Sequence, residues 1–126
     1  MELLDTKTDN RGSLLKFKLG KKKFLIVLTK KGFLRGGETH NMPQRTILAE
    51  GKIEVVTKLL IANSKGIYQN VDITNTYKGV QEFFIPPNTP HYFRFLEDSV
   101  IMEYEDENMT REYYPEYRKI VEESMK

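Results

Sequence analysis

Hydrophobic and polar residues alternate along most of the chain, and this period of two predicts short β-strands. Leu15, Phe17 and Leu19 alternate with lysines, as in a strand that buries one face, and residues 24–29 form a more fully apolar strand. We expect these two strands to pair through the turn at residues 20–23. The same patterns predict further strands at residues 46–49, 53–56, 59–62, 67–73, 81–85, 91–95 and 100–104.

Polar turn segments separate the predicted strands and indicate how they connect. Gly51 lies between the strands at 46–49 and 53–56, and glycine adopts the positive φ angle of a tight turn at little cost, so we expect a second hairpin there. Many short strands with polar turns are typical of an antiparallel all-β sandwich or barrel, here with a core at about residues 13–105. The period then changes to 3.6 residues, which predicts a short C-terminal α-helix at about residues 115–125, opened by a proline.

Length and composition narrow the class of protein. The 126 residues match the usual size of one domain, so we expect a single domain over residues 1–126. Hydrophobic residues make up 39% of the chain and charged residues 30%, which is typical of a globular protein rather than a disordered one. The net charge of +2 and the dispersed lysines lack the clustered basic face of a nucleic-acid-binding protein. Without a signal pattern or a long apolar run, we expect a soluble cytoplasmic protein with no nucleic-acid or membrane partner.

The candidate chemistry lies at the two histidines, which are the only ones in the chain. His40 ends the run Arg-Gly-Gly-Glu-Thr-His, and His91 ends the run Pro-Pro-Asn-Thr-Pro-His. Neutral imidazole is a common metal ligand and a common general acid or base near neutral pH. The chain has no cysteine, so a metal ion would be held by nitrogen and oxygen atoms alone. We expect the two rings to meet in one folded site.

The spacing around these histidines resembles the two sequence motifs of the cupin superfamily of small β-barrels. The first motif of that family has glycine, five residues, His-x-His, three or four residues, glutamate, six residues and glycine. The chain has this spacing at Gly32, Glu38, His40, Gln44 and Gly51. The second motif, Pro-x-Gly-x-x-His, corresponds to residues 86–91, where Asn88 replaces glycine. Asparagine is the next best residue for a left-handed turn, so we expect the turn to be kept.

The resemblance implies a cupin-type barrel, also called a double-stranded β-helix or jelly roll, with a site in its mouth. It implies that Glu38, His40, Gln44 and His91 point into the barrel and bind a divalent metal such as zinc, iron, manganese or nickel. Glu38 replaces the first histidine of the motif and Gln44 replaces the glutamate, so one carboxylate is kept at a changed position. Two histidines and one carboxylate suffice for an open metal site. In a metal-dependent enzyme, Glu38, His40 and His91 would be the catalytic residues.

A narrower resemblance is to the cupins that act as nucleotide-sugar 3,4-ketoisomerases and 3,5-epimerases, which typically need no metal. It implies that His40 is an acid or base, that Arg35 and Arg45 contact phosphate, and that Tyr92 is a candidate substrate contact. Glu38 departs from this pattern, because its counterpart is a histidine and a carboxylate would repel a diphosphate.

Other possibilities remain open from the sequence alone. The barrel could bind a ligand without turnover, or Glu38 could pair with Arg35 or Arg45 in a site that holds no metal. The expected ligand is a small molecule, such as a sugar or a sugar nucleotide. The resemblance also implies a homodimer, for which edge strands rich in β-branched and aromatic residues give a physical motive.

Overall fold

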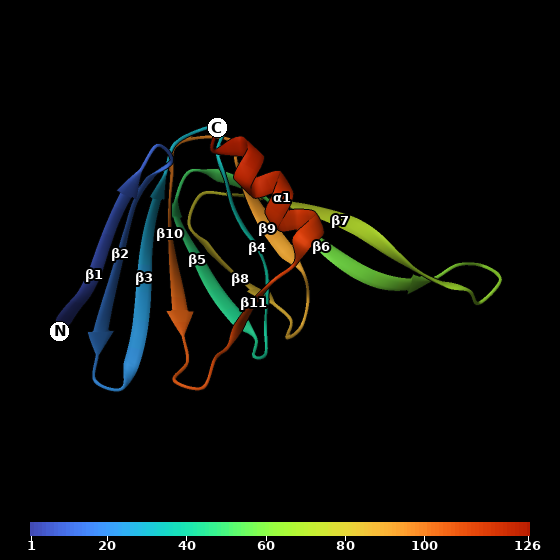
Figure 1. Cartoon of the computed structure of the whole chain (residues 1–126), viewed down its shortest axis with the longest axis horizontal. Helices are drawn as coiled ribbons and strands as arrows, with labels where there is room; N and C mark the ends of the chain where they lie inside the picture. Colours follow the sequence, from blue (N-terminus) through green and yellow to red (C-terminus); the bar gives the residue numbers. More distant parts are fainter.

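The structure is a computed structural model that describes all residues, 1–126, as two antiparallel sheets and one helix (Figure 1). The first six strands are β1 (Glu2–Asp9), β2 (Gly12–Leu19), β3 (Lys22–Thr29), β4 (Leu34–His40), β5 (Gln44–Glu50) and β6 (Lys52–Ala62). The rest of the chain forms β7 (Tyr68–Lys78), β8 (Gln81–Ile85), β9 (His91–Phe95), β10 (Ser99–Glu105), β11 (Arg111–Tyr113) and α1 (Pro115–Ser124).

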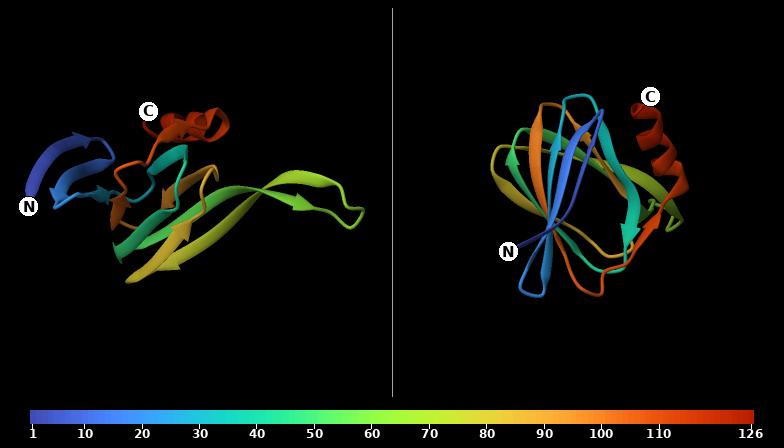
Figure 2. Two further views of the ribbon diagram at one scale, coloured as in Figure 1. Left: turned by 90° about the horizontal axis from the view of Figure 1, so that it is seen from below. Right: turned by 60° about the vertical axis from the view of Figure 1, so that its left-hand side comes forward.

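The two sheets face each other and enclose a barrel, which is seen nearly end-on in the right-hand view of Figure 2. The larger sheet has six strands in the order β1-β2-β3-β10-β5-β8, and the smaller has five in the order β11-β4-β9-β6-β7. Every neighbouring pair is antiparallel. The predicted all-β barrel with a short C-terminal helix is therefore confirmed. The helix has ten residues, so it is too short to cross a membrane.

Most predicted strands form, and the predicted β2–β3 hairpin is confirmed. The hairpin predicted around Gly51 is wrong, because β5 pairs with β10 and β8 while β6 pairs with β7 and β9. The turn at Gly51 instead carries the chain from one sheet to the other. Its φ angle is +108°, and an added Cβ atom would lie 2.0 Å from Ser99 Oγ, so glycine is required for this close approach.

The barrel interior holds the main apolar core, and α1 covers the outside of the smaller sheet. The ten buried core residues come from β3, β5, β6, β8, β9 and β10: Leu25, Val27, Leu48, Ile53, Val55, Phe83, Ile85, Phe93, Phe95 and Ile101. On the other face of the smaller sheet, Tyr117 and Val121 of α1 pack against Leu34, Val56 and Tyr92. No helix covers the outer face of the larger sheet (Figure 1).

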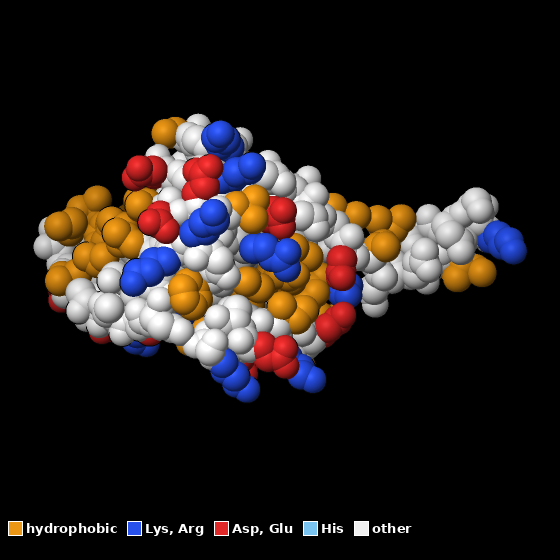
Figure 3. Space-filling model, turned by 90° about the horizontal axis from the view of Figure 1, so that it is seen from above, with side chains coloured by type: hydrophobic (Ala, Val, Ile, Leu, Met, Phe, Trp, Pro, Cys, Tyr) orange, Lys and Arg blue, Asp and Glu red, His pale blue; other side chains and the backbone are white.

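β6 and β7 extend beyond the barrel as a two-stranded arm (Figure 2, left). Hydrophobic side chains are exposed along this arm (Figure 3), among them Leu60, Ile61, Ile67 and Tyr68 near its tip. The end of β6 and most of β7 are exposed because no third strand or helix packs on them.

Candidate metal centre

A β-bulge in β4 sets which side chains face the barrel interior. Arg35 lies opposite Phe93 and Glu38 opposite His91 on β9, and the register shifts between Gly36 and Glu38. A regular strand would point residues 35 and 38 to opposite faces, because side chains alternate. The bulge restores both to the interior, where both line one cavity. Gly36 and Gly37 have φ angles of +100° and +84°, so two glycines are needed for this conformation.

Three potential ligands meet at this point of the barrel. Glu38 and His40 are two residues apart on β4, so their side chains share one face. His91 lies directly across the ladder from Glu38. One ligand atom from each lies within 4.8 Å of the other two. The imidazole centroids of His40 and His91 are 5.1 Å apart, and both residues are buried. Donor atoms at about 2.1 Å from an ion can be at most roughly 4.2 Å apart, so a small closure of the side chains would complete a binding geometry.

His91 is held in the state that a metal ligand requires. Its Nδ1 lies 2.9 Å from the Thr89 carbonyl oxygen, which accepts the proton of that nitrogen. The lone pair is therefore on Nε2. Burial lowers the pKa of His91 to about 4, against the opposing effect of the bond to Thr89, so the ring is neutral at pH 7.

Glu38 supplies the negative charge of the cluster. Its Oε1 lies 3.5 Å from His40 Nε2, and its Oε2 lies 3.2 Å from Nε of Arg111, which is opposite His40 on β11. Burial alone would raise the pKa of the Glu38 carboxyl, but the bond with His40 and the charge of Arg111 outweigh burial and lower it. The sequence left open that Glu38 pairs with Arg35 or Arg45. In the structure it pairs with neither, because its partners are His40 and Arg111.

The unpaired polar atoms of the buried side chains coincide with this cluster. His40 Nδ1, Gln44 Oε1 and His91 Nε2 are buried and have no hydrogen-bond partner. Gln44 is 2% exposed on the interior face of β5, where its amide nitrogen lies 3.5 Å from Thr46 Oγ1. An unsatisfied buried polar atom costs about 1–3 kcal/mol. Three of them, all from the motif positions, indicate that the site is built for a partner that the protein does not itself provide.

The loop before His91 takes the conformation expected from its sequence. Asn88 has a φ angle of +55° and is the only residue other than glycine with a positive value. Its backbone N–H donates to the carbonyl of His40 at 2.6 Å. The left-handed turn therefore fastens the loop of one histidine to the strand of the other, although the two are 51 positions apart.

The substrate contacts expected from the sequence are only partly brought to the cavity. Arg35 lines it, and its Nε donates to Thr29 Oγ1 at 2.6 Å. Arg45 lies on the outer face of the larger sheet, where it pairs with Glu82. Tyr92 alternates with the interior residues of β9, so it points outward and packs against Tyr117. The strand period of two already places Tyr92 opposite to His91.

Charged residues that sequence reasoning missed also line the cavity. Glu103 of β10 is in register with the buried Leu25 and Thr46, so it faces the interior. Burial, and then the charge of Glu38, raise the pKa of Glu103 to about 7. Arg111 lies beyond the expected end of the barrel, in a short strand with no clear pattern. The alternation within β10 was the one signal that could have identified Glu103.

Solved structures with similar folds agree with this architecture. The capsular polysaccharide assembling protein CapF from Staphylococcus aureus matches 88% of the chain with a TM-score of 0.60 and 18% identity. Pumpkin seed globulin matches 89% with a TM-score of 0.70 and 9% identity, and oxalate decarboxylase from Bacillus subtilis matches 86% with a TM-score of 0.64 and 14% identity. The chain has the cupin fold.

The cupin similarity is one of fold alone at these identities. The chain spans 29% of the CapF chain, 35% of the globulin chain and 29% of the decarboxylase chain. No protein-family model matches the sequence, and no curated protein matches it. The function therefore has to follow from the side chains of this chain itself.

Proposed function

We propose that the protein binds a divalent metal ion through Glu38, His40 and His91, with Gln44 beside them as an oxygen ligand or hydrogen-bond partner. The unpaired Nε2 of the neutral His91 carries this proposal. The set of two imidazoles and one carboxylate suits zinc, iron(II), manganese or nickel and leaves coordination positions open. When bound, the ion would polarise a carbonyl or hydroxyl group of a ligand or activate water.

The surrounding residues support this arrangement. The Thr89 carbonyl fixes the His91 tautomer, and Arg111 orients Glu38, as expected of groups just outside a metal site. A cavity of about 230 Å³ is lined by Glu38, so a small molecule in it would lie beside that carboxylate. Two of the similar cupins have names that refer to oxalate and to a polysaccharide, which is consistent with a small organic ligand.

Untagged protein allows a direct test, because the chain has only two histidines. Titration with manganese(II) should broaden both imidazole signals in the NMR spectrum, and zinc should raise the melting temperature. At a hundredfold excess over the dissociation constant, an ion adds about 2.7 kcal/mol of stability. His91→Ala should abolish both effects, whereas Glu82→Gln, on the outer face, should keep them. Unchanged imidazole signals and melting temperature with zinc, manganese, iron(II) and nickel would overturn the proposal.

Two ligand assays distinguish the remaining candidate functions. A metal-independent isomerase or epimerase would exchange solvent deuterium into a keto-sugar without added metal and would lose this activity in His40→Ala. A ligand-binding barrel without turnover would retain ligand binding in the double variant His40→Ala, His91→Ala. The Glu38–His40 pair and the raised pKa of Glu103 are the observations that favour proton transfer as the second candidate.

We also propose that the protein forms a homodimer through the outer face of the larger sheet. Side chains on this face form two cross-strand rows, Leu15–Ile26–Met102–Ile47 and Phe17–Phe24–Tyr104–Arg45–Phe84. Phe24 stacks on Phe17 and meets the edge of Tyr104, so the face is apolar across four strands. The charged residues on this face have partners within the chain, since Arg45 pairs with Glu82 and Lys22 lies over the Tyr104 ring at 5.2 Å. The apolar rows are therefore available to a second copy.

A further inference from the structure

The cavity beside Glu38 carries an excess of positive charge. It is lined by fourteen residues from both sheets, α1 and the turn after β1, and five of these are basic: Lys7, Arg11, Arg35, Arg111 and Arg118. Only two acidic residues, Glu38 and Glu103, line the same space. Charges removed from water are normally paired, so the least exposed cations without a partner decide what the cavity accepts.

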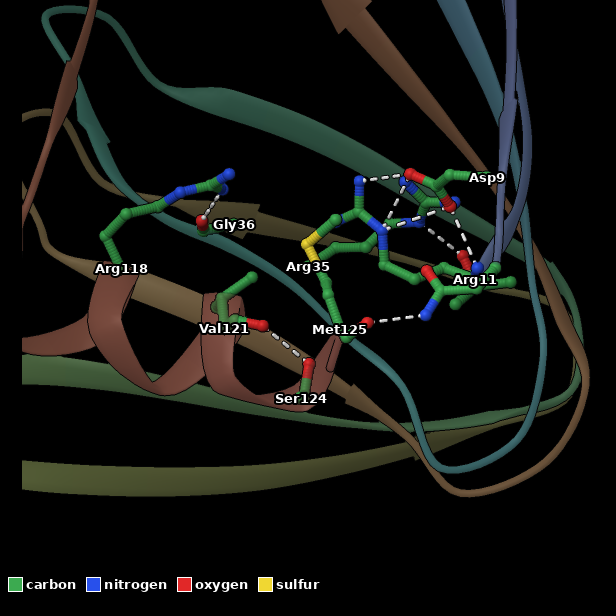
Figure 4. Close-up of polar contacts among 10 residues, drawn as sticks. Asp9, Arg11, Arg35, Gly36, Arg118, Val121, Ser124 and Met125 are labelled. Carbon is green, nitrogen blue, oxygen red and sulfur yellow. Dashed lines mark hydrogen bonds and ion pairs between the residues drawn. The ribbon is translucent and has the colours of Figure 1, made fainter.

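Three of the five cations have partners within the protein. Arg11 pairs with Asp9 at 2.8 Å, and Arg111 pairs with Glu38 and Glu105. Arg118 donates to the Gly36 carbonyl and pairs with Glu122. Figure 4 shows Arg11 turned to Asp9 and Arg118 turned to Gly36.

Arg35 and Lys7 have no carboxylate partner. The guanidinium of Arg35 has one hydrogen bond, from Nε to the neutral Thr29 hydroxyl, and its two Nη groups have none. Burial, and then repulsion from Arg11, lower the pKa of Arg35 to about 10, so it is still charged at pH 7. Lys7 lies opposite the inward-facing Leu14 on β2 and forms no ion pair.

We propose that the cavity binds a small organic anion, a carboxylate or a phosphate ester, whose negative group contacts the free Nη atoms of Arg35 and faces Lys7. The planar guanidinium matches a two-oxygen anion in a bidentate contact. Because Arg35 and Glu38 both line the cavity, the other end of such a ligand would lie beside Glu38, the one proposed metal ligand among the lining residues. This subsite rests on the small-molecule site proposed above and gives it a ligand class.

The size of the cavity limits the ligand. A volume of about 230 Å³ lies below the range of roughly 300–1,000 Å³ that encloses drug-sized ligands. A sugar nucleotide would leave most of its atoms outside. A compact anion with a carboxylate or phosphate at one end and a hydroxyl or keto group at the other fits this volume, with its anionic end at Arg35 and its other end beside Glu38.

The test titrates the metal-free full chain with inorganic phosphate and, separately, with malonate at constant ionic strength. Binding is measured by NMR chemical shifts. At least one probe should bind saturably and shift the Nε signal of Arg35. Arg35→Gln should weaken binding at least tenfold, and Lys7→Gln, at an exposed position that folding tolerates, should weaken it several-fold. Tighter binding of phosphate identifies a phosphate ester as the natural ligand class, and tighter binding of malonate a carboxylate.

Arg94→Gln provides the matched control, because Arg94 pairs with Glu54 outside the cavity and its loss should not change anion binding. His91→Ala separates the two proposals, since it should lose metal binding and keep anion binding. Metal binding without saturable binding of either anion, or equal affinity in wild type and Arg35→Gln, would overturn the anion subsite alone. Anion binding without metal binding would overturn the metal centre alone.

Discussion

His91 and Glu103 face the same cavity and shift the stability of the protein in opposite directions with pH. The pKa of His91 falls from 6.5 to about 4 on folding, so the unfolded state binds more protons between these values and stability rises with pH there. The pKa of Glu103 rises from 4.5 to about 7, so the folded state keeps its proton longer and stability falls as pH rises through that window. Between pH 4.5 and 6.5 the two effects oppose each other.

Replacing Glu103 should therefore expose the titration of His91. Metal-free Glu103→Gln should gain up to about 3 kcal/mol of unfolding free energy between pH 4 and pH 6.5, because one pKa unit corresponds to about 1.4 kcal/mol. The wild type should change much less between pH 4.5 and 6.5. Urea denaturation with EDTA at several pH values measures this, and His91→Gln should show the reverse slope. A flat profile in Glu103→Gln would contradict the opposition.

The residues of the candidate site differ in how far sequence could predict them. The sequence predicts that Glu38, His40 and His91 meet, because the spacing within the two motifs resembles that of a barrel family in which these positions face one site. Arg45 and Tyr92 were not brought to the cavity, because sequence proximity to a motif residue does not set the face of a strand. The bulge that turns Arg35 inward depends on the pairing of β4 with β9. The sequence pattern around Arg35 does not reveal this long-range contact.

Gly37 lies in β4 at the point where α1 packs against this strand, and it determines how closely the helix can approach. A Cβ atom there would lie 2.7 Å from Arg118 Cα, so only glycine lets the helix backbone pack so closely on the strand. The predicted helix was correct because its period is local. Its docking site was not predictable, since the paired glycines have the same appearance in a simple bend.

Gly37→Ala should destabilise the protein by about 3 kcal/mol, because it combines a strained positive φ with a clash against the helix backbone. Gly79→Ala is the matched control: its φ angle is +76° and no atom lies within 4 Å of an added Cβ. We expect about 1–2 kcal/mol there, from the backbone alone. Urea unfolding monitored by circular dichroism compares the two, and equal losses would refute the role of the helix contact.

The fold was predictable at the level of strands and less so at the level of their connections. Strands β8 and β9 match their predicted ranges because alternation and turn residues mark them clearly. The connection at Gly51 was misassigned, because a strand–glycine–strand pattern is common to hairpins and to turns that cross between sheets. β1 was missed because all eight of its residues are exposed, so no buried face marks it.

At the scale of the whole molecule, the uncovered face of the larger sheet is the surface of the proposed dimer. Met102→Lys should convert the proposed dimer to a monomer, because it places a charge in the middle of the apolar rows. Size-exclusion chromatography with light scattering measures the mass. Ile67→Lys, near the tip of the arm, adds the same charge at an exposed apolar position and should leave the dimer intact. A wild-type monomer, or a variant that remains dimeric, would refute this interface.

The pairing of β4 with β9 also governs when the centre can exist during folding. Glu38 and His40 of β4 meet the distant His91 of β9 only after the ladder between these strands has closed. An ion that needs all three side chains can bind only where this ladder has formed. Its kinetic effect therefore reports when the ladder closes: slower unfolding with unchanged refolding means that the transition state lacks it.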